Sequence, residues 1–186
     1  DVMVSHLELP PYRGDVLYGS NSIPHFVDVR DRSGDTFSGV SLWDFETMNL
    51  TAGGRNERIF GVMASANHFA VLGATALLGR TFVAAEDTGR RAHPVVVLSY
   101  AAWKGRFGGD SAIVGRPIIL NGRSYSIVGV MRPEFRGALP LVTPALWVPL
   151  MQLEDIRPGD STRFTRRGNN SFNIIARLKP GVTIAQ

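Results

Sequence analysis

The sequence predicts one domain in which short strands and short helices are mixed, and three observations support this prediction. The chain has 186 residues, the length of one domain or of two lobes that share a core. It is 44% hydrophobic and 19% charged, which excludes intrinsic disorder for most of its length. Its 20 glycines and 11 prolines follow no period, which favours many turns over a helical bundle.

The first predicted helix begins after Ser22. Residues 1–20 show no sustained period, so we expect an irregular or strand-like lead-in. Ser22 belongs to the residue types that cap helices, and Ile23-Pro24 opens a helix to about Arg32, because proline is tolerated in a first turn. Ser33-Gly34 ends this helix.

A hairpin with one solvent-exposed face follows. Its strands are Val40–Leu50 and Arg58–Ala64, joined at residues 51–54, and aromatic side chains alternate with acidic ones at positions 43–46. A short helix is expected at about Asn67–Leu72. Residues 78–82 are expected to form an irregular connection.

The middle of the chain contains the clearest helix signal. Val95–Leu98 is apolar and predicts a strand that is buried on both faces. Ser99 then caps a helix that Gly108-Gly109 ends. One stripe of this helix carries its aromatic residues, Tyr100, Trp103 and Phe107.

The later part of the chain predicts a second hairpin and two further strands. Asn121-Gly122 joins Pro117–Leu120 to Ser124–Met131, a strong local signal for a tight hairpin. Leu146–Leu150 is predicted to be an edge strand, because Pro149 cannot donate to a strand ladder. Residues 157–170 are polar and loop-like, and Ser171–Leu178 returns to strand character.

The two ends of the sequence have the character of cut ends. Residues 179–181, Lys-Pro-Gly, predict a turn, and Thr183 is a candidate cap of a helix that stops at Gln186. The chain starts at Asp1 without an initiator methionine or a signal peptide. We therefore expect it to be part of a longer protein.

Charge and hydropathy exclude two classes of function. The net charge is +4, from 18 arginines and 2 lysines against 16 acidic residues. The basic residues are scattered, and their densest group is Arg163, Arg166 and Arg167. A nucleic-acid interface normally concentrates its charge into a stripe. The uncharged runs 59–79 and 137–153 are interrupted by polar residues, glycines or prolines, so neither is expected to span a membrane.

A search for chemical motifs yields no catalytic, cofactor-binding or metal-ligating residue. The chain lacks cysteine and a P-loop, and its four histidines, at positions 6, 25, 68 and 93, are too far apart for a metal pair on one helix. His68 lies in an apolar run and is interpreted as a packing residue. Residues 39–43, Gly-Val-Ser-Leu-Trp, lack the last glycine of a nucleophile elbow.

The acidic residues give no better candidates. Asp28, Asp31 and Asp35 lack the glycine and glutamate of a calcium loop and are interpreted as a charged helix face. Glu86-Asp87 and Glu154-Asp155 are adjacent pairs, which suit caps or solvated turns better than general acid and base catalysis.

Several segments in order resemble one protein family. Residues 65–73, Ser-Ala-Asn-His-Phe-Ala-Val-Leu-Gly, and 78–82, Leu-Gly-Arg-Thr-Phe, are similar to the S-x-N-Y-F-x-V-L-G and x-G-R-x-F stretches of MacB-like periplasmic core domains. His68 stands where this family usually has tyrosine. The resemblance covers residues 22–186 and continues through segments 95–99, 107–110, 113–115, 119–122, 125–131, 146–150 and 176–182.

This resemblance implies an α+β domain outside the cytoplasmic membrane, inserted after the first of four transmembrane helices of an ABC transporter permease of the MacB and FtsX-like superfamily. Residues 1–186 would form one periplasmic core domain in two lobes. Residues 1–65 with 171–186 would form a membrane-proximal, porter-like lobe, and residues 66–170 an inserted, strand-rich lobe. An apolar span of about 20 residues is expected before residue 1, and three after residue 186.

The resemblance also implies a function without catalytic residues or cofactors in this domain. ATP would be hydrolysed on a cytoplasmic nucleotide-binding domain or subunit, and the domain would relay the motion to substrate or to a periplasmic adaptor, within a dimer and without nucleic acid. Two alternatives stay open: a periplasmic module that binds a lipid or small molecule, with the run 137–153 lining a cleft, and an uncharacterised hydrolase.

Overall fold

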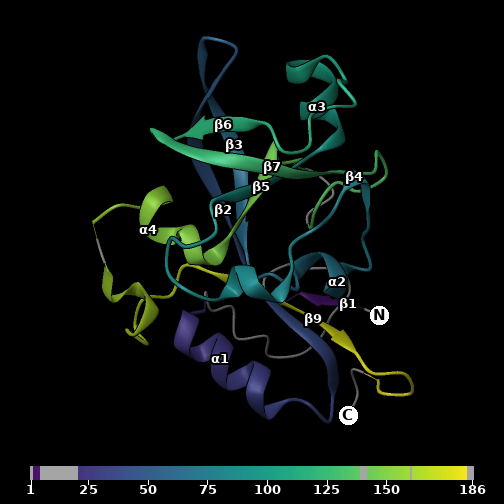
Figure 1. Ribbon diagram of the computed structural model, residues 1–186. Helices are drawn as coiled ribbons and strands as arrows, with labels where there is room; N and C mark the ends of the chain where they lie inside the picture. Colours follow the sequence, from purple (N-terminus) through teal and green to yellow (C-terminus); the bar gives the residue numbers. More distant parts are fainter. Residues whose placement is uncertain (1, 5–20, 139–141, 160, 184–186) are drawn as a thin grey trace.

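The computed structural model describes residues 2–4, 21–138, 142–159 and 161–183 (Figure 1). Its α-helices are α1 (Ile23–Arg32), α2 (His68–Leu72), α3 (Tyr100–Phe107) and α4 (Leu153–Ile156). Its 3-10 helices are η1 (Ala84–Asp87), η2 (Leu150–Gln152) and η3 (Ser161–Phe164). Its strands are β1 (Val2–Val4), β2 (Phe37–Ala52), β3 (Arg55–Ala64), β4 (Ala76–Gly79), β5 (Val95–Leu98), β6 (Pro117–Leu120), β7 (Arg123–Met131), β8 (Leu146–Pro149) and β9 (Asn173–Leu178). The α+β fold class is confirmed.

The nine strands in the described part of the chain belong to one sheet, and part of this sheet closes on itself. The strand order is β1-β9-β2-β3-β8-β5-β7-β4, and β6 pairs with both β7 and β2. β6 pairs with β7 at one end of the run β2-β3-β8-β5-β7 and with β2 at the other end, at Leu50↔Leu120 and Thr51↔Ile119. The five strands of this run and β6 form a closed circuit, which we call the ring.

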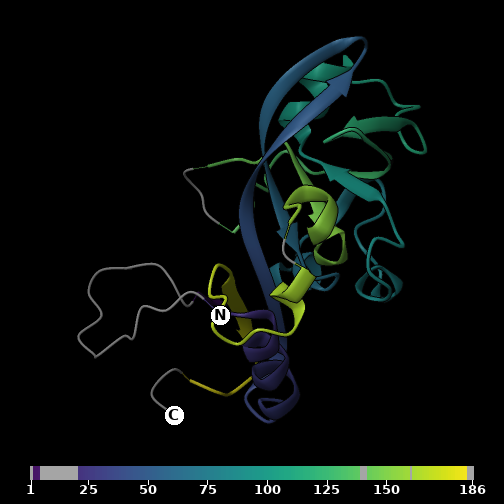
Figure 2. The same ribbon diagram turned by 90° about the vertical axis from the view of Figure 1, so that its left-hand side faces the viewer.

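Several of the elements at the other end of β2 form a second body, which we call the base. It contains β1, β9, the first half of β2, α1 and α2, and β9 lies between β1 and β2 in antiparallel pairing. Figures 1 and 2 show the base below the ring, with the β2–β3 hairpin running from one to the other. β1 and β9, the described strands nearest to the chain ends, both lie in the base.

Two apolar clusters fill opposite faces of the sheet. The first extends from α1 along one face of β2 into the inside of the ring; it includes Phe26, Leu42, Met48, Leu50, Ile59, Leu120, Ile127 and Val148. The second lies under α2 on the other face and includes Trp43, Phe69, Phe82, Met131, Trp147 and Ile175. Because α1 and α2 cover both faces, residues 40–43 of β2 are all buried, and the predicted exposed face is confined to the outer part of the hairpin.

The helix and turn signals in the sequence are confirmed. The Ser22 hydroxyl accepts a hydrogen bond from the His25 N–H at 3.2 Å, and the Ser99 hydroxyl accepts one from the Ala102 N–H at 3.1 Å. Asn121 and Gly122 both have positive φ angles, 48° and 82°, as a tight turn between antiparallel strands requires. These features depend on neighbours in sequence, and for that reason the sequence shows them.

The predicted edge strand at residues 146–150 is wrong. β8 lies inside the sheet, parallel to β3 and antiparallel to β5, and all four of its residues are buried. Pro149 is the last residue of β8 and pairs with Ala64 of β3, while the pairing with β5 involves only Leu146 and Trp147. Proline, which lacks an N–H, is therefore accommodated at the end of β8, because β5 does not pair with this residue and needs no hydrogen bond from it.

The connection predicted at residues 78–82 is also partly wrong, because Leu78 and Gly79 belong to β4 and pair with β7. The strand near residues 171–178 is confirmed as β9, and α4, which follows β8, was not predicted. β1 agrees with the strand-like lead-in, whereas residues 5–20 lie outside the described residues. The helix expected after Thr183 also lies outside them.

Candidate functional site at the neck between base and ring

Two acidic side chains interrupt the apolar face of β2 where the strand passes from the base to the ring. Side chains of even-numbered residues share this face because successive strand residues point to opposite sides. Leu42 lies toward α1 and Met48 lies inside the ring, both in the first apolar cluster. Asp44 and Glu46 lie between them, with side chains that are 16% and 12% exposed. The strand thus carries two poorly solvated carboxylates at this crossing, which we call the neck.

Arg157 neutralises part of this charge. Its guanidinium forms ion pairs with both Asp44 and Glu46, and its side chain is only 18% exposed. It also donates to the Ser171 hydroxyl at 3.0 Å and lies 5.3 Å from the centre of the Phe172 ring. Arg157 therefore connects the β2 crossing with the segment that leads into β9.

The electrostatics of the neck favour a single arrangement. Burial raises the pKa of the Asp44 carboxyl above its ordinary value, although Arg157 and the hydrogen bond from the Phe45 N–H act in the opposite direction. Two carboxylates share one guanidinium, so removal of Arg157 would leave two like charges close together in a poorly solvated place. Removal of Arg157 should therefore cost more stability than removal of one partner from an ion pair at the surface.

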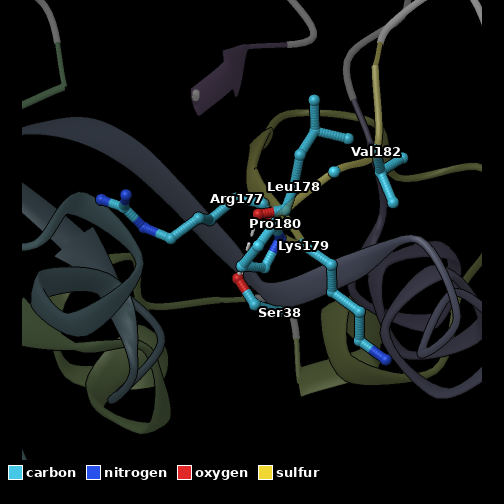
Figure 3. Close-up of a pocket in the computed structure, with 7 residues that line it drawn as sticks. Ser38, Arg177, Leu178, Lys179, Pro180 and Val182 are labelled. Carbon is cyan, nitrogen blue, oxygen red and sulfur yellow. Dashed lines mark hydrogen bonds between the residues drawn. The ribbon is translucent and has the colours of Figure 1, made fainter.

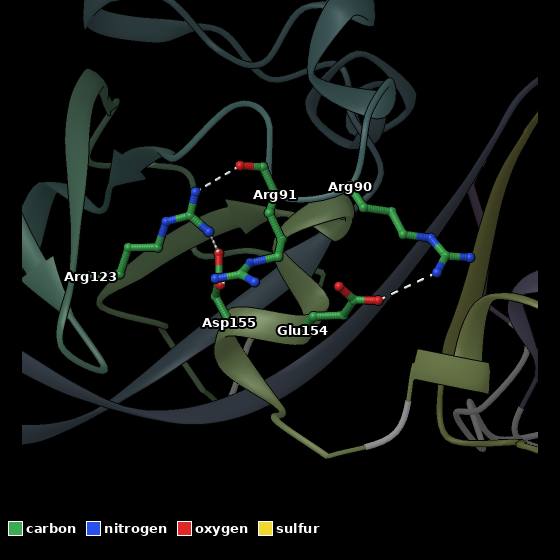
Figure 4. Close-up of polar contacts among 5 residues, drawn as sticks. All are labelled: Arg90, Arg91, Arg123, Glu154 and Asp155. Atoms are coloured by element: carbon green, nitrogen blue, oxygen red, sulfur yellow. Dashed lines mark hydrogen bonds and ion pairs between the residues drawn. The ribbon is translucent and has the colours of Figure 1, made fainter.

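Residues 150–159 and 161–164, which we call the strap, contact the ring through Asp155 (Figure 4). Asp155 forms ion pairs with Arg91, at 2.6 Å, and with Arg123 of β7, and its side chain is only 5% exposed. Arg123 also donates to the carbonyl of Arg91 at 2.8 Å. The Arg91 N–H in turn donates to the carbonyl of Met151 at 2.9 Å. The sequence predicted a cap or a solvated turn for Glu154-Asp155. Both residues lie in the first turn of α4, but the Asp155 side chain is ion-paired and poorly solvated.

Further contacts extend the strap toward the base. Glu154 pairs with Arg90 at 3.4 Å, and the Arg90 guanidinium lies 4.3 Å from the centre of the Phe164 ring. After the strap, Arg167 of the predicted basic group pairs with Asp28 of α1. The strap and the residues after it thus contact β7, β2 and α1, which belong to both bodies.

A serine and a histidine meet in the base, although the sequence showed no nucleophile motif. The Ser41 hydroxyl lies 2.9 Å from Nδ1 of His68 and 3.0 Å from the Ser65 hydroxyl. A serine hydroxyl that is hydrogen-bonded to an imidazole is the arrangement of a catalytic nucleophile and its general base. Ser41 and His68 are both fully buried, and burial lowers the pKa of His68 to about 3. This pair holds α2 on β2 in an inaccessible place, which agrees with the packing role predicted for His68.

The other residues considered in the sequence are dispersed. His25 is exposed on α1, His93 is partly buried before β5, and His6 lies outside the described residues. Within the described ranges, no group of three histidine or acidic residues is arranged to hold a metal ion. Glu86 and Asp87 accept backbone N–H groups of Val83 and Ala66, as predicted for caps, but Glu86 is buried and pairs with Arg80.

The grooves at the end of β9 and between the β2–β3 hairpin and α3 are lined by other residues than the described part of the run 137–153. A groove of about 440 Å³ lies where β9 ends, lined by Ser38 and residues 177–182, and the Ser38 hydroxyl donates to the carbonyl of Arg177 at 3.1 Å (Figure 3). Its lining carries neither a carboxylate nor an imidazole. The described part of the run 137–153 instead supplies β8 to the core. None of the helices in the described ranges has the length and apolar character that a membrane crossing requires.

The fold is similar to that of domains from bacterial transporters and permeases. The periplasmic region of MacB from Actinobacillus actinomycetemcomitans matches with a TM-score of 0.70 at 17% identity, over 99% of this chain and 77% of that one. A domain of a putative permease from Porphyromonas gingivalis matches at 0.64 and 14% identity, over 89% and 71%. The extracellular domain of the ABC-type transporter YknZ from Gram-positive bacteria matches at 0.59 and 17% identity, over 83% and 73%.

The family assignment comes from the sequence itself. The model of the MacB-like periplasmic core domain matches residues 10–186. The chain belongs to this family and is a periplasmic core domain of an ABC-type transporter permease, as the resemblance implied. No curated protein matches the chain at a significant level.

Sequence reasoning missed the neck. Asp44 and Glu46 appear in the sequence as the polar half of an alternating strand, and Arg157 as the start of a polar loop. Residues 44 and 157 are 113 positions apart, so no local pattern connects them. The one available signal is the pair of acidic residues within an otherwise apolar strand face, which calls for a cationic partner.

Proposed function

We propose that this domain relays motion from cytoplasmic ATP hydrolysis to the periplasm, without catalysing a reaction itself. The observation that carries the proposal is the neck, where one arginine and two carboxylates couple the base to the ring. A relay needs its two bodies to move together, and charged contacts in a poorly solvated place oppose independent motion more than surface pairs do. The strap contacts add to this coupling.

The proposal includes the arrangement that the family implies. Transmembrane helices would flank the domain on both sides, an ATP-binding subunit or domain would act through them, and the complete transporter would be a dimer that engages a periplasmic adaptor. Residues 1–65 with 171–186 would form the membrane-proximal lobe and residues 66–170 the inserted lobe. The location of β1 and the end of β9 in one body supports the placement of both attachments in the membrane-proximal lobe.

Energy transfer in the full-length permease tests the relay. A donor dye at exposed Ser111, beyond α3, reports its distance from acceptor lipids in a nanodisc that contains the permease and its ATP-binding subunit. We expect the transfer efficiency to differ between the nucleotide-free state and the state trapped with ADP and vanadate. In Arg157→Met, ATP hydrolysis should continue while this nucleotide-dependent change becomes smaller.

The matched control is Arg30→Met, which removes an ion pair at the exposed surface of α1, where Arg30 and Asp31 are 47% and 57% exposed. It should leave the nucleotide-dependent change intact. A hydrolysis-defective ATP-binding subunit tests whether the signal depends on turnover. Equal transfer efficiencies in the two nucleotide states of the unmodified permease would contradict the relay.

A further inference from the structure

The distal part of β3 has an open edge. β3 pairs with β2 along its whole length but with β8 only from Gly61 to Ala64. Along residues 55–60, no described strand pairs with the side of β3 that faces away from β2. Figure 1 shows the tip of the hairpin rising above the rest of the ring. Open strand edges can accept an additional strand from another polypeptide.

Alternate peptide groups point outward from this edge. The two-residue turn at Gly53-Gly54 makes Ala52 and Arg55 a hydrogen-bonded pair. The N–H and C=O groups of Asn56 and Arg58 therefore point away from β2. Phe60 shows the same alternation, because its carbonyl accepts a hydrogen bond from the Ala145 N–H at 2.7 Å. The N–H and C=O of residues 56 and 58, with the N–H of residue 60, face the open side.

A groove of about 620 Å³ lies beside this edge, between the hairpin and α3. Its lining includes Leu50 and Ala52 of β2, Arg55 of β3 and Arg106 of α3. The ion pair between Arg106 and Glu57 links α3 to β3. The groove therefore offers both apolar contact and cationic groups.

The charge of the edge favours an acidic occupant. Arg55 and Arg58 are exposed, and neither forms an ion pair with a carboxylate in the described part of the chain, whereas Glu57 is paired with Arg106. The Phe60 side chain, on the same face as Arg58, is 55% exposed. Arg55 and Arg58 lie on opposite faces of β3, so an extended segment that alternates acidic and apolar side chains places its acidic ones beside one of these arginines and its apolar ones on the other face.

We infer that the β3 edge at Arg55–Phe60 binds, by strand addition, an acidic extended segment of a partner protein. Main-chain hydrogen bonds to residues 56, 58 and 60 would supply affinity, and the arginine on the acidic face of the segment, Arg55 or Arg58, would select the sign of charge. A second copy of this chain is a poorer occupant, because its own edge carries the same unpaired arginines. The inference rests on the partner-docking part of the proposed function.

A peptide of seven residues, with valine and glutamate alternating and both ends blocked, is the probe. Amide hydrogen exchange and NMR spectra of the 186-residue chain report binding residue by residue. We expect slower exchange at Asn56, Arg58 and Phe60 when the peptide is added. A peptide with lysine in place of glutamate should bind at least about tenfold more weakly. In a second control, two consecutive central amides of the acidic peptide are N-methylated. Consecutive N–H groups point to opposite edges of a strand, so this peptide cannot pair through either edge and should not bind.

Two variants at one position separate backbone from charge. Arg58→Pro removes an N–H that points away from β2, so the β2–β3 ladder stays intact, and proline is compatible with an edge strand. Arg58→Ala removes the charge and keeps the N–H. We expect Arg58→Pro to bind the acidic peptide about tenfold more weakly than Arg58→Ala, as the loss of a main-chain hydrogen bond predicts.

Three results would overturn the inference: equal binding of the N-methylated peptide, equal binding of the lysine peptide, or protection of residues 56–60 that arises from dimerisation of the chain alone. If Arg58→Pro fails to fold, the N-methylated peptide still decides the question. Neither nucleotide nor membrane is present in this experiment. Its failure would leave the relay standing, and a failure of the energy-transfer experiment would leave strand addition standing.

Discussion

Arg157 is the residue on which the neck depends, because it is the cation that faces both Asp44 and Glu46. At pH 7, Arg157→Met should lower the free energy of unfolding by about 2 to 3 kcal/mol, somewhat below the loss for a fully buried pair since water reaches part of the site. Urea denaturation of the chain measures this loss.

The pH dependence of Arg157→Met identifies its cause. Protonation removes the repulsion between the two carboxylates, and burial already raises the pKa of Asp44. The loss should therefore shrink when the denaturation is repeated at pH 4. The double variant Arg157→Met with Asp44→Asn should recover part of the stability at pH 7. An equal loss at both pH values would show that lost packing, rather than charge, is responsible.

His68 makes the stability of the chain depend on pH. Burial lowers its pKa from 6.5 to about 3, so the unfolded chain binds a proton at pH 5 that the folded chain does not bind. The stabilisation from neutral His68 is complete above pH 6.5 and is lost as the pH falls toward 3. Between pH 7 and pH 5 this loss amounts to about 2 kcal/mol.

His68→Gln should remove this dependence while keeping a polar group near Ser41. The difference in unfolding free energy between the unmodified chain and His68→Gln should change by about 2 kcal/mol from pH 7 to pH 5, measured by urea denaturation. His25→Gln, at an exposed position on α1, is the control substitution. A constant difference between the unmodified chain and His68→Gln would contradict a neutral buried histidine.

Among the elements, β4 and β7 pair through two glycines that face each other, and both positions require glycine. Gly79 pairs with Gly129, and a methyl group on Gly129 would lie 2.0 Å from the carbonyl oxygen of Arg80. Gly129→Ala should therefore destabilise the chain by about 2 kcal/mol or more through displacement of β4. Thermal unfolding followed by circular dichroism measures this effect.

Gly105→Ala is the matched control for Gly129→Ala. Gly105 lies within α3, and no atom of another segment would contact an added methyl group there. This substitution should stabilise the chain by up to about 1 kcal/mol, because alanine favours the helix. Similar effects of the two substitutions would contradict the close approach of β4 to β7.

The elements that the sequence predicted are those with local signals. Ser22, Ser99 and Asn121-Gly122 act on residues within four positions, and each forms the expected cap or turn. The position of β8 depends on pairing with β3 and β5, which the sequence does not display, so Pro149 suggested an edge that does not exist. β4 was missed for a related reason, since its pairing partner β7 begins 44 residues after it.

The candidate site was less predictable than the fold. The search for motifs tested catalytic and metal-binding patterns, whereas the neck consists of one arginine and two carboxylates from distant segments. The contact of Ser41 with His68 was hidden for the same reason, because 27 positions and a hairpin separate them. Alternation in β2 indicated which residues share a face but not what covers that face.

For the whole molecule, the ring should be the last part to open. β5 and β8 have neighbouring strands on both sides and are almost entirely buried, whereas α1 is a surface helix packed on β2 and η3. Amides of Val97 and Trp147 should exchange with deuterium only through global unfolding, and amides of α1 should exchange faster through local opening. Native-state hydrogen exchange measured by NMR provides the test. Faster exchange in β5 than in α1 would show that the ring opens first.

The continuity of β2 has a geometric consequence. Its 16 residues run without a break from the base to the tip of the hairpin, which corresponds to a length of at most about 50 Å. Such a strand acts as a lever arm: a tilt of about 5° at its lower end displaces the upper end by about 4 Å, provided that the strand stays straight. That displacement is close to the spacing between neighbouring strands of a sheet. A small rotation of the base would then suffice to move the open edge of β3 by nearly a full strand position.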